Sequence, residues 1–131
     1  MIDVSGLAPE QAKRYTLTRD GDRDLTFTGW RVGEGEHGSG GTSGYECDWN
    51  RGVKVRIYLT RGGRAVVSRR HWARGQGAGE SHEADLYDSA EALLTGLRDE
   101  DGRLRAAEKI AWDDACGNVA GLEIAKHEVI E

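Results

Sequence analysis

The sequence has few of the residues that mark disulfide-rich, metal-binding or membrane proteins. Its 131 residues include one proline, one phenylalanine, one methionine and two cysteines, Cys47 and Cys116. Because the two cysteines lie far apart in the chain, they lack the short spacing of a metal site, and we expect free buried thiols. No apolar run has the length of a secretory signal or of a membrane span, which predicts a cytoplasmic protein without a membrane partner.

Catalytic motifs are scarce as well. The four histidines are scattered without the spacing of zinc ligands, and no Gly-x-Ser-x-Gly nucleophile motif occurs. The densest group of titratable residues consists of Glu80, His82, Glu83 and Asp85. We interpret this group as a solvated strand edge and not as an acid–base pair. We therefore expect no metal and no other cofactor, and we favour a protein without catalytic activity.

Charged residues are distributed unevenly along the chain, whose net charge is −5. Residues 1–50 hold nine acids and five bases, residues 51–78 hold eight bases and no acid, and residues 79–131 hold fourteen acids and five bases. The three segments therefore carry −4, +8 and −9. Either the acidic C-terminal segment folds back over the basic segment, or the basic segment is left free for a partner.

A β-hairpin over residues 53–74 carries most of the basic segment. Apolar and polar side chains alternate from Val53 to Thr60, as in a half-buried strand, and the pair Gly62-Gly63 suits a tight turn before a return strand over residues 64–72. A turn centred on the two glycines predicts three cross-strand pairs: Leu59 with Val66, Ile57 with Ser68, and Val53 with Trp72.

The outward face of this hairpin is the predicted binding surface, because it would be basic with an aromatic side chain between the cations. The candidate partner-binding residues are Lys54, Arg56, Tyr58, Arg69, His71, Trp72 and Arg74. Arg56 and Arg69 are expected directly opposite each other. Such a like-charged pair needs a nearby acid or an external partner, and Glu108, Asp113 and Asp114 are the candidate acids.

Further strands are expected before the central hairpin. Residues 1–12 form a loose lead-in, residues 14–19 and 25–32 form a first hairpin with a bulge at Gly29, and Tyr45–Trp49 form a short strand. Trp30 and Trp112 lie in apolar patterns and are predicted to be core residues, whereas Trp49 and Trp72 lie at strand ends as core plugs or interface anchors.

A glycine-rich segment, Gly33–Gly44, holds six glycines and is expected to be a flexible loop. Gly33, Gly35 and Gly38 match the pattern G-x-G-x-x-G, which can cradle a phosphate. No helix follows the pattern, however, and Glu34 and Glu36 would repel an anion, so no phosphate site is predicted.

The spacing becomes helical after a polar edge strand at Ser81–Tyr87. Asp88 is the expected N-cap of a helix of about ten residues that ends near Asp99–Gly102, with Glu91 completing a capping box. A second amphipathic helix is predicted to end at Gly117-Asn118. Its expected buried face consists of Leu104, Ala107, Ile110, Ala111 and Ala115.

Strands followed by helices predict a single α+β domain over residues 1–131. It consists of an antiparallel β-meander of five to six strands over residues 14–87, followed by two helices, within residues 88–117, that pack on one face. The C-terminal segment, residues 118–131, is open between a last strand and a frayed helix over Leu122–Ile130.

Three motifs lie between residues 55 and 93. They are Val55-Arg56-Ile57-Tyr58-Leu59-Thr60-Arg61-Gly62-Gly63-Arg64, His71-Trp72, and Tyr87-Asp88-Ser89-x-Glu91-x-Leu93. Together they resemble the EXLDI family of small uncharacterised bacterial proteins. The Glu-x-Leu-Asp-Ile segment of that family does not occur in this sequence, whose residues 128–131 are Glu128-Val129-Ile130-Glu131. The resemblance implies no activity, cofactor or site residue.

From these patterns we predict a non-catalytic protein-interaction module, such as an inhibitor or adaptor encoded by a bacterium or a mobile element. It would act through its segregated acidic and basic surfaces. Two alternatives stay open. The hairpin at residues 53–74 could bind nucleic acid, or the sheet and helices could enclose a ligand-binding or catalytic pocket that strand alternation does not reveal.

Overall fold

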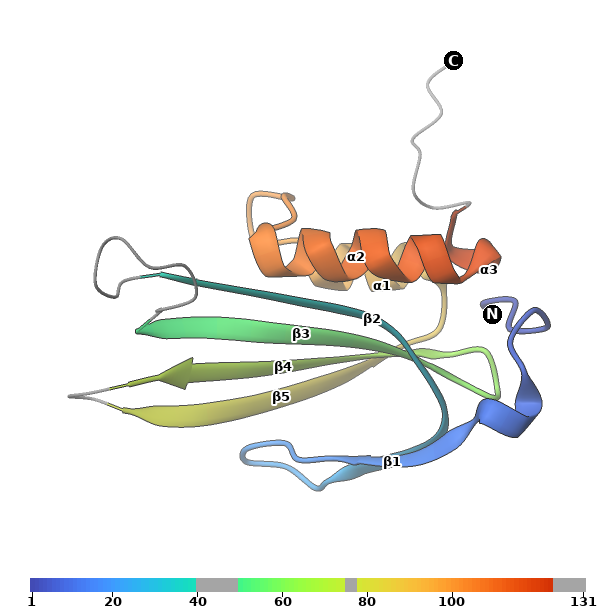
Figure 1. The fold of residues 1–131 in the computed structure, drawn as a ribbon, viewed down its shortest axis with the longest axis horizontal. Coiled ribbons are helices and arrows are strands. Elements are labelled where there is room, and N and C mark those ends of the chain that lie inside the picture. Colours follow the sequence, from blue (N-terminus) through green and yellow to red (C-terminus); the bar gives the residue numbers. More distant parts are fainter. Residues whose placement is uncertain (40–49, 75–77, 124–131) are drawn as a thin grey trace, which may run out of the picture.

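A computed structural model describes residues 1–39, 50–74 and 78–123. Five antiparallel strands form one sheet in which neighbours in sequence are neighbours in space (Figure 1). They are β1 (Lys13–Leu17), β2 (Leu25–Ser39), β3 (Arg51–Thr60), β4 (Ala65–Ala73) and β5 (Gly79–Tyr87). A short 3-10 helix, η1 (Pro9–Gln11), precedes them. The predicted antiparallel sheet is therefore confirmed, with five strands among the described residues.

In the described part of the chain, three helices follow the sheet and lie over one of its faces (Figure 1). They are α1 (Ala90–Leu97), α2 (Ala106–Asn118) and α3 (Ala120–Glu123). The predicted α+β class is thus confirmed. None of the helices in the described part of the chain has the length and the apolar character needed to cross a membrane.

β2 includes a glycine-rich segment that was expected to be a loop. Gly33 and Gly35 are two residues apart in this strand, so both face the side on which α2 lies. A Cβ atom at Gly35 would lie 2.3 Å from the carbonyl oxygen of Ala107, and one at Gly33 would lie 2.5 Å from that of Ala111. The glycines therefore allow a helix to approach closely, and the prediction of a flexible loop was wrong for residues 33–39.

The path of β2 also differs from the prediction at its bulge. The register with β3 shifts between Arg31 and Gly33, not at Gly29. Gly29 instead lies against the neighbouring strand, because a Cβ atom there would be 1.9 Å from the carbonyl oxygen of Leu59. The strand predicted at Tyr45–Trp49 lies outside the described residues, as do Cys47, His127 and the chain after residue 123.

The N-cap of α1 is Ser89 and not Asp88. The Ser89 hydroxyl accepts a hydrogen bond of 3.0 Å from the backbone N–H of Ala92, whereas Asp88 forms an ion pair of 2.8 Å with Arg64. The cap is thus one residue later than predicted, and α1 ends at Leu97, before the expected end near residues 99–102.

The principal core lies between the sheet and the helices. Val55, Ile57 and Leu59 of β3 are fully buried there, and Trp112 of α2 is 3% exposed, as its apolar pattern predicted. Trp30 packs against the same core and donates its indole N–H to the carbonyl oxygen of Ala8 at 2.9 Å. Of the predicted buried face of α2, the three alanines are buried, but Ile110 is 47% exposed and Leu104 lies before the helix, partly buried against the core.

A smaller aromatic cluster covers the opposite face, because the sheet curls and brings β1 beneath its other strands (Figure 1). The ring centroids of Tyr15, Phe27 and Tyr58 lie 4.8 to 5.6 Å apart. Asp20, in the loop after β1, fixes the curl through two bonds to β5. Its N–H donates to the carbonyl oxygen of His82 at 2.9 Å, and its carboxylate accepts the His82 N–H at 2.8 Å.

Candidate functional site

The register of the β3–β4 hairpin decides which predicted binding residues share a face. Leu59 lies opposite Ala65, and the observed pairing is one residue away from the predicted one throughout the hairpin. The turn is centred on Gly62. The backbone N–H of Thr60 donates to the carbonyl oxygen of Arg64, the N–H of Arg64 donates to the Thr60 hydroxyl, and Gly63 has a positive φ of 82°. Side chains alternate along a strand, so this shift by one residue moves each β4 side chain to the other face.

The shift separates two groups of the predicted binding residues. Lys54, Arg56 and Tyr58 lie on the face turned away from the helices, whereas Arg69 and His71 of β4 lie on the helix side. Tyr58 is only 2% exposed, so it offers no surface for stacking. The prediction of one outward face that carries all five residues was therefore wrong.

The opposed arginine pair does not form either. Arg56 lies opposite Ser68, and Arg69 lies opposite Val55. The other two predicted binding residues lie at the end of β4, where the guanidinium of Arg74 stacks 5.1 Å from the ring centroid of Trp72.

On the face away from the helices, neighbouring strands supply the counter-charges. The Nζ atom of Lys54 lies 3.0 Å, and the Nε atom of Arg56 3.2 Å, from the same carboxylate oxygen of Glu34 on β2. Arg70 lies 2.6 Å from Glu80 on β5. The hydrogen bond from Lys54 is the main cause that lowers the pKa of Glu34. This face of the hairpin is therefore neutralised within the fold.

The acids of α2 do not provide that neutralisation, contrary to the prediction. Asp113 pairs with Lys109 of its own helix at 3.1 Å. Asp114 accepts the backbone N–H of Glu34 at 3.0 Å. The third predicted acid, Glu108, lies in a groove that the sequence did not reveal.

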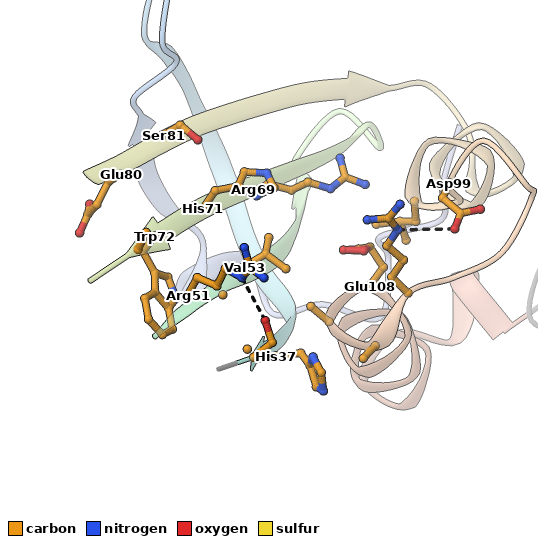
Figure 2. Close-up of a pocket in the computed structure, with 18 of the residues that line it drawn as sticks. His37, Arg51, Val53, Arg69, His71, Trp72, Glu80, Ser81, Asp99 and Glu108 are labelled. Atoms are coloured by element: carbon orange, nitrogen blue, oxygen red, sulfur yellow. Dashed lines mark hydrogen bonds and ion pairs between the residues drawn. The ribbon is translucent and has the colours of Figure 1, made fainter. Parts of the chain in front are cut away.

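This groove has a volume of about 800 Å³ and lies on the helix side of the sheet, at the end remote from the β3–β4 turn. Its floor consists of the ends of β2, β3, β4 and β5, and its wall consists of the C-terminal end of α1 and the first turn of α2 (Figure 2). Four arginines line it: Arg51, Arg69, Arg98 and Arg105. The volume is within the range of ligand-binding clefts.

Three of these arginines have no carboxylate partner among the described residues. Arg69 donates to the carbonyl oxygen of Gly96 at 3.0 Å. Arg51 donates to the hydroxyl of Ser39 at 3.3 Å, the dashed line beside Arg51 in Figure 2. Arg98, at the end of α1, is exposed and forms no side-chain hydrogen bond or ion pair with any residue described. Positive charge in the groove is therefore not balanced by ion pairs within the fold.

The fourth arginine, Arg105, forms an ion pair with Asp99 on the wall of the groove. The Nε atom of Arg105 lies 3.5 Å from the carboxylate of Asp99 (Figure 2). The pKa of Asp99 is lowered, chiefly because its carboxylate accepts the backbone N–H of Arg103. Asp99 is thus occupied by the loop between the helices and cannot balance the other arginines.

Glu108 is the one buried charged residue in the described part of the chain, with 5% of its surface exposed. It is the third residue of α2, and its side chain points into the space between the helix and the sheet (Figure 2). Its carboxylate forms no hydrogen bond or ion pair with another described residue. Every fully enclosed side-chain oxygen among the described residues has a hydrogen-bond partner. The oxygens of Glu108 have none, so they are not fully enclosed and are open to the groove.

Among the residues that the structure describes, the other candidate groups lie apart or form ion pairs. No group of three or more acidic, histidine or cysteine side chains could hold a metal ion within residues 1–39, 50–74 and 78–123. In the titratable group on β5, Glu80 pairs with Arg70 and lies 3.4 Å from His82, while Glu83 lies 3.9 Å from His71. These exposed contacts belong to the edge strand of the sheet.

Three groove arginines, Arg51, Arg98 and Arg105, were missed from the sequence, and Glu108 was named only as an acid for the predicted arginine pair. Strand alternation offered a signal for Arg51, because it lies two residues before Val53 and therefore on the same face as this residue. No comparable signal exists for Arg98 or Glu108, whose place in the groove depends on how the helices pack on the sheet.

Comparison of the chain with known protein families, curated proteins and solved structures finds no significant match. The resemblance to the EXLDI family therefore stays a prediction, and the function has to be argued from the groove itself.

Proposed function

We propose that this protein is a non-catalytic binding module whose groove receives an acidic segment of a partner protein. One observation carries the proposal, namely the contrast between the two faces of the β3–β4 hairpin. Lys54 and Arg56 on one face share the carboxylate of Glu34, whereas Arg51 and Arg69 on the other face have only neutral hydrogen-bond acceptors. An inhibitor or adaptor, as predicted from the charge pattern, would bind a partner in this way.

Arginine in such a groove is suited to bind carboxylates. A guanidinium presents a planar set of donors that can bind both oxygens of one carboxylate, and hydrogen bonds to charged groups contribute about 1.5–3 kcal/mol each. Arg69 is already fixed by its bond to Gly96, so its donors are held in place before a partner arrives. Arg98 at the exposed end of α1 would add attraction over a longer distance.

The groove favours a peptide over nucleic acid. A nucleic acid backbone carries a negative charge at each phosphate, whereas this groove also contains the carboxylates of Asp99 and Glu108. The chain as a whole has a net charge of −5, which opposes non-specific binding to phosphates. A peptide can place its acids at the arginines and avoid the groove's own carboxylates.

Fluorescence anisotropy with a short labelled peptide of Asp and Gly tests this proposal. The variant Arg51→Gln/Arg98→Gln removes two groove charges, and Lys54→Gln/Arg56→Gln is the matched control because it removes two charges from the opposite face. We expect the groove variant to bind roughly tenfold or more weakly, which corresponds to the loss of about 1.4 kcal/mol, and the control to bind like the wild type.

Two outcomes would contradict the proposal. Equal weakening by both double variants would mean that the peptide responds only to overall charge. Tighter binding of a single-stranded oligonucleotide than of the peptide, lost in the groove variant, would identify a nucleic-acid interface in place of a protein interface.

A further inference from the structure

We infer that the acidic segment bound in the groove also carries a basic side chain, a lysine or an arginine, whose charged group pairs with Glu108. This inference rests on the proposed function, since it concerns the chemistry of the same bound segment. The inferred ligand carries charges of both signs. Its acidic side chains bind Arg51 and Arg98, and one basic side chain enters the groove next to α2.

The burial of Glu108 is the first observation behind this inference. Only 5% of the residue is exposed, yet its carboxylate has no donor among the described residues. A buried glutamate is normally paired with a cation or a hydrogen-bond donor, because an ionised carboxylate in a largely buried side chain is unfavourable without a partner. Ala107 and Ala111, which flank it on α2, show that this part of the helix is otherwise packed with small apolar side chains.

The position of Glu108 in its helix explains only part of its placement. As the third residue of α2, it benefits from the positive end of the helix dipole. A glutamate at this position commonly also accepts a hydrogen bond from the backbone N–H of the N-cap residue. Here the N-cap is Arg105, and neither its side chain nor that of Glu108 forms a capping bond. The carboxylate therefore keeps its acceptor capacity for another group.

The direction of the side chain makes the groove the source of that group. Figure 2 shows Glu108 extending from α2 into the space bounded by Arg51, Val53 and Arg69. Its oxygens are open to this space, because among the described residues every enclosed side-chain oxygen has a hydrogen-bond partner and these oxygens have none. None of the groove arginines forms an ion pair with Glu108, since Arg69 donates to Gly96, Arg51 to Ser39 and Arg105 to Asp99.

A basic side chain on the ligand would satisfy this carboxylate without disturbing those bonds. Its aliphatic stem could lie along Val53 and Leu97, which line the groove, while its charged end meets Glu108. The acids on either side of it would meet Arg51 and Arg98. Opposite charges at fixed places set the register of a bound peptide and reject segments with one sign only.

Two matched peptides test the inference. One has a central arginine between aspartates, and the other has citrulline in its place, which keeps the shape of the side chain but not its charge. With the wild-type protein we expect the arginine peptide to bind about tenfold more tightly in the anisotropy assay. Glu108→Gln, which keeps the size of the side chain, is expected to remove this preference while the citrulline peptide binds as before.

The outcomes separate this inference from the proposed function. If the wild type binds both peptides equally, and Arg51→Gln/Arg98→Gln weakens both, the groove binds acids and only the role of Glu108 is wrong. If the wild type binds neither peptide, the proposed function is overturned as well. A thermal melt shows whether Glu108→Gln is folded. If this variant does not fold, the affinities of the two peptides for the wild-type protein still test whether the groove prefers a cation.

Discussion

The close approach of α2 to β2 can be tested by adding a single methyl group at Gly35. In Gly35→Ala the new Cβ atom would lie 2.3 Å from the carbonyl oxygen of Ala107 and 2.6 Å from the backbone nitrogen of Ala111. Ordinary contacts of a Cβ atom begin near 3.4 Å, so the helix would have to move by about 1 Å. The atoms in the way belong to the backbone, and no side-chain rotation can relieve the clash.

The expected effect on stability follows from this geometry. Extra volume in a packed interface costs about 1–3 kcal/mol, and a clash with a helix backbone belongs in the upper half of that range. We therefore expect Gly35→Ala to lower the free energy of unfolding by about 2–3 kcal/mol and the melting temperature by roughly 6–12 °C. Gly35 does not have a positive φ, so backbone strain does not contribute to the loss.

Thermal and urea unfolding measure this loss, with Gly79→Ala as the control. Gly79 also lies in a strand, but nothing lies within 4 Å of an added Cβ atom there, so its substitution should leave stability unchanged or raise it by about 0.4–1 kcal/mol. A Gly35→Ala variant that melts with the wild type would refute the close packing of α2. It would also weaken the groove argument, because Ala107 precedes Glu108 in the helix wall.

Two further predictions concern single polar contacts. Because Lys54 and Arg56 hold the pKa of Glu34 below its ordinary 4.5, their ion pairs stabilise the fold above that pH and lose this effect as the pH falls through the lowered pKa. Glu34→Gln should therefore cost up to about 1 kcal/mol in neutral melts and little in strong acid, and an equal loss at both would contradict the pairing. Ser89→Ala should cost about 1 kcal/mol and Asp88→Ala less than half of that, whereas the reverse order would restore Asp88 as the cap of α1.

Local patterns in the sequence were sufficient for several elements of the fold. Alternation between Val53 and Thr60 identified β3, and helical spacing after residue 104 identified α2 to within a few residues. Both signals are local, because burial of one face forces a period on the sequence whatever the rest of the chain does. For the same reason, the class and the order of the elements could be predicted.

The faces of the hairpin could not be predicted in the same way. A turn that holds a pair of glycines can be centred on one of them or between them, and this half-residue difference exchanges the faces of β4. Arg69 was therefore placed beside Arg56, when in the structure it reaches α1 through the carbonyl oxygen of Gly96. The groove depends further on the packing of α1 and α2, for which local patterns hold no signal.

The segment Gly33-Glu34-Gly35-Glu36 links the packing of the helix to the charge of the groove. Its glycines face α2 and let it lie close to the sheet, whereas the intervening glutamates lie beside β3 on the other face, opposite Arg56 and Lys54 in the strand register. A strand cannot present both kinds of residue on one face at these positions, since side chains alternate. Because these glycines allow the close contact with α2, β2 has no acidic side chain on the helix side at these positions. Its Glu34 instead pairs with Lys54 and Arg56 on the opposite face. The packing of α2 therefore explains why the groove arginines have no acidic partner on β2. A ligand with acidic side chains would neutralise these arginines, as Glu34 neutralises Lys54 and Arg56 on the opposite face.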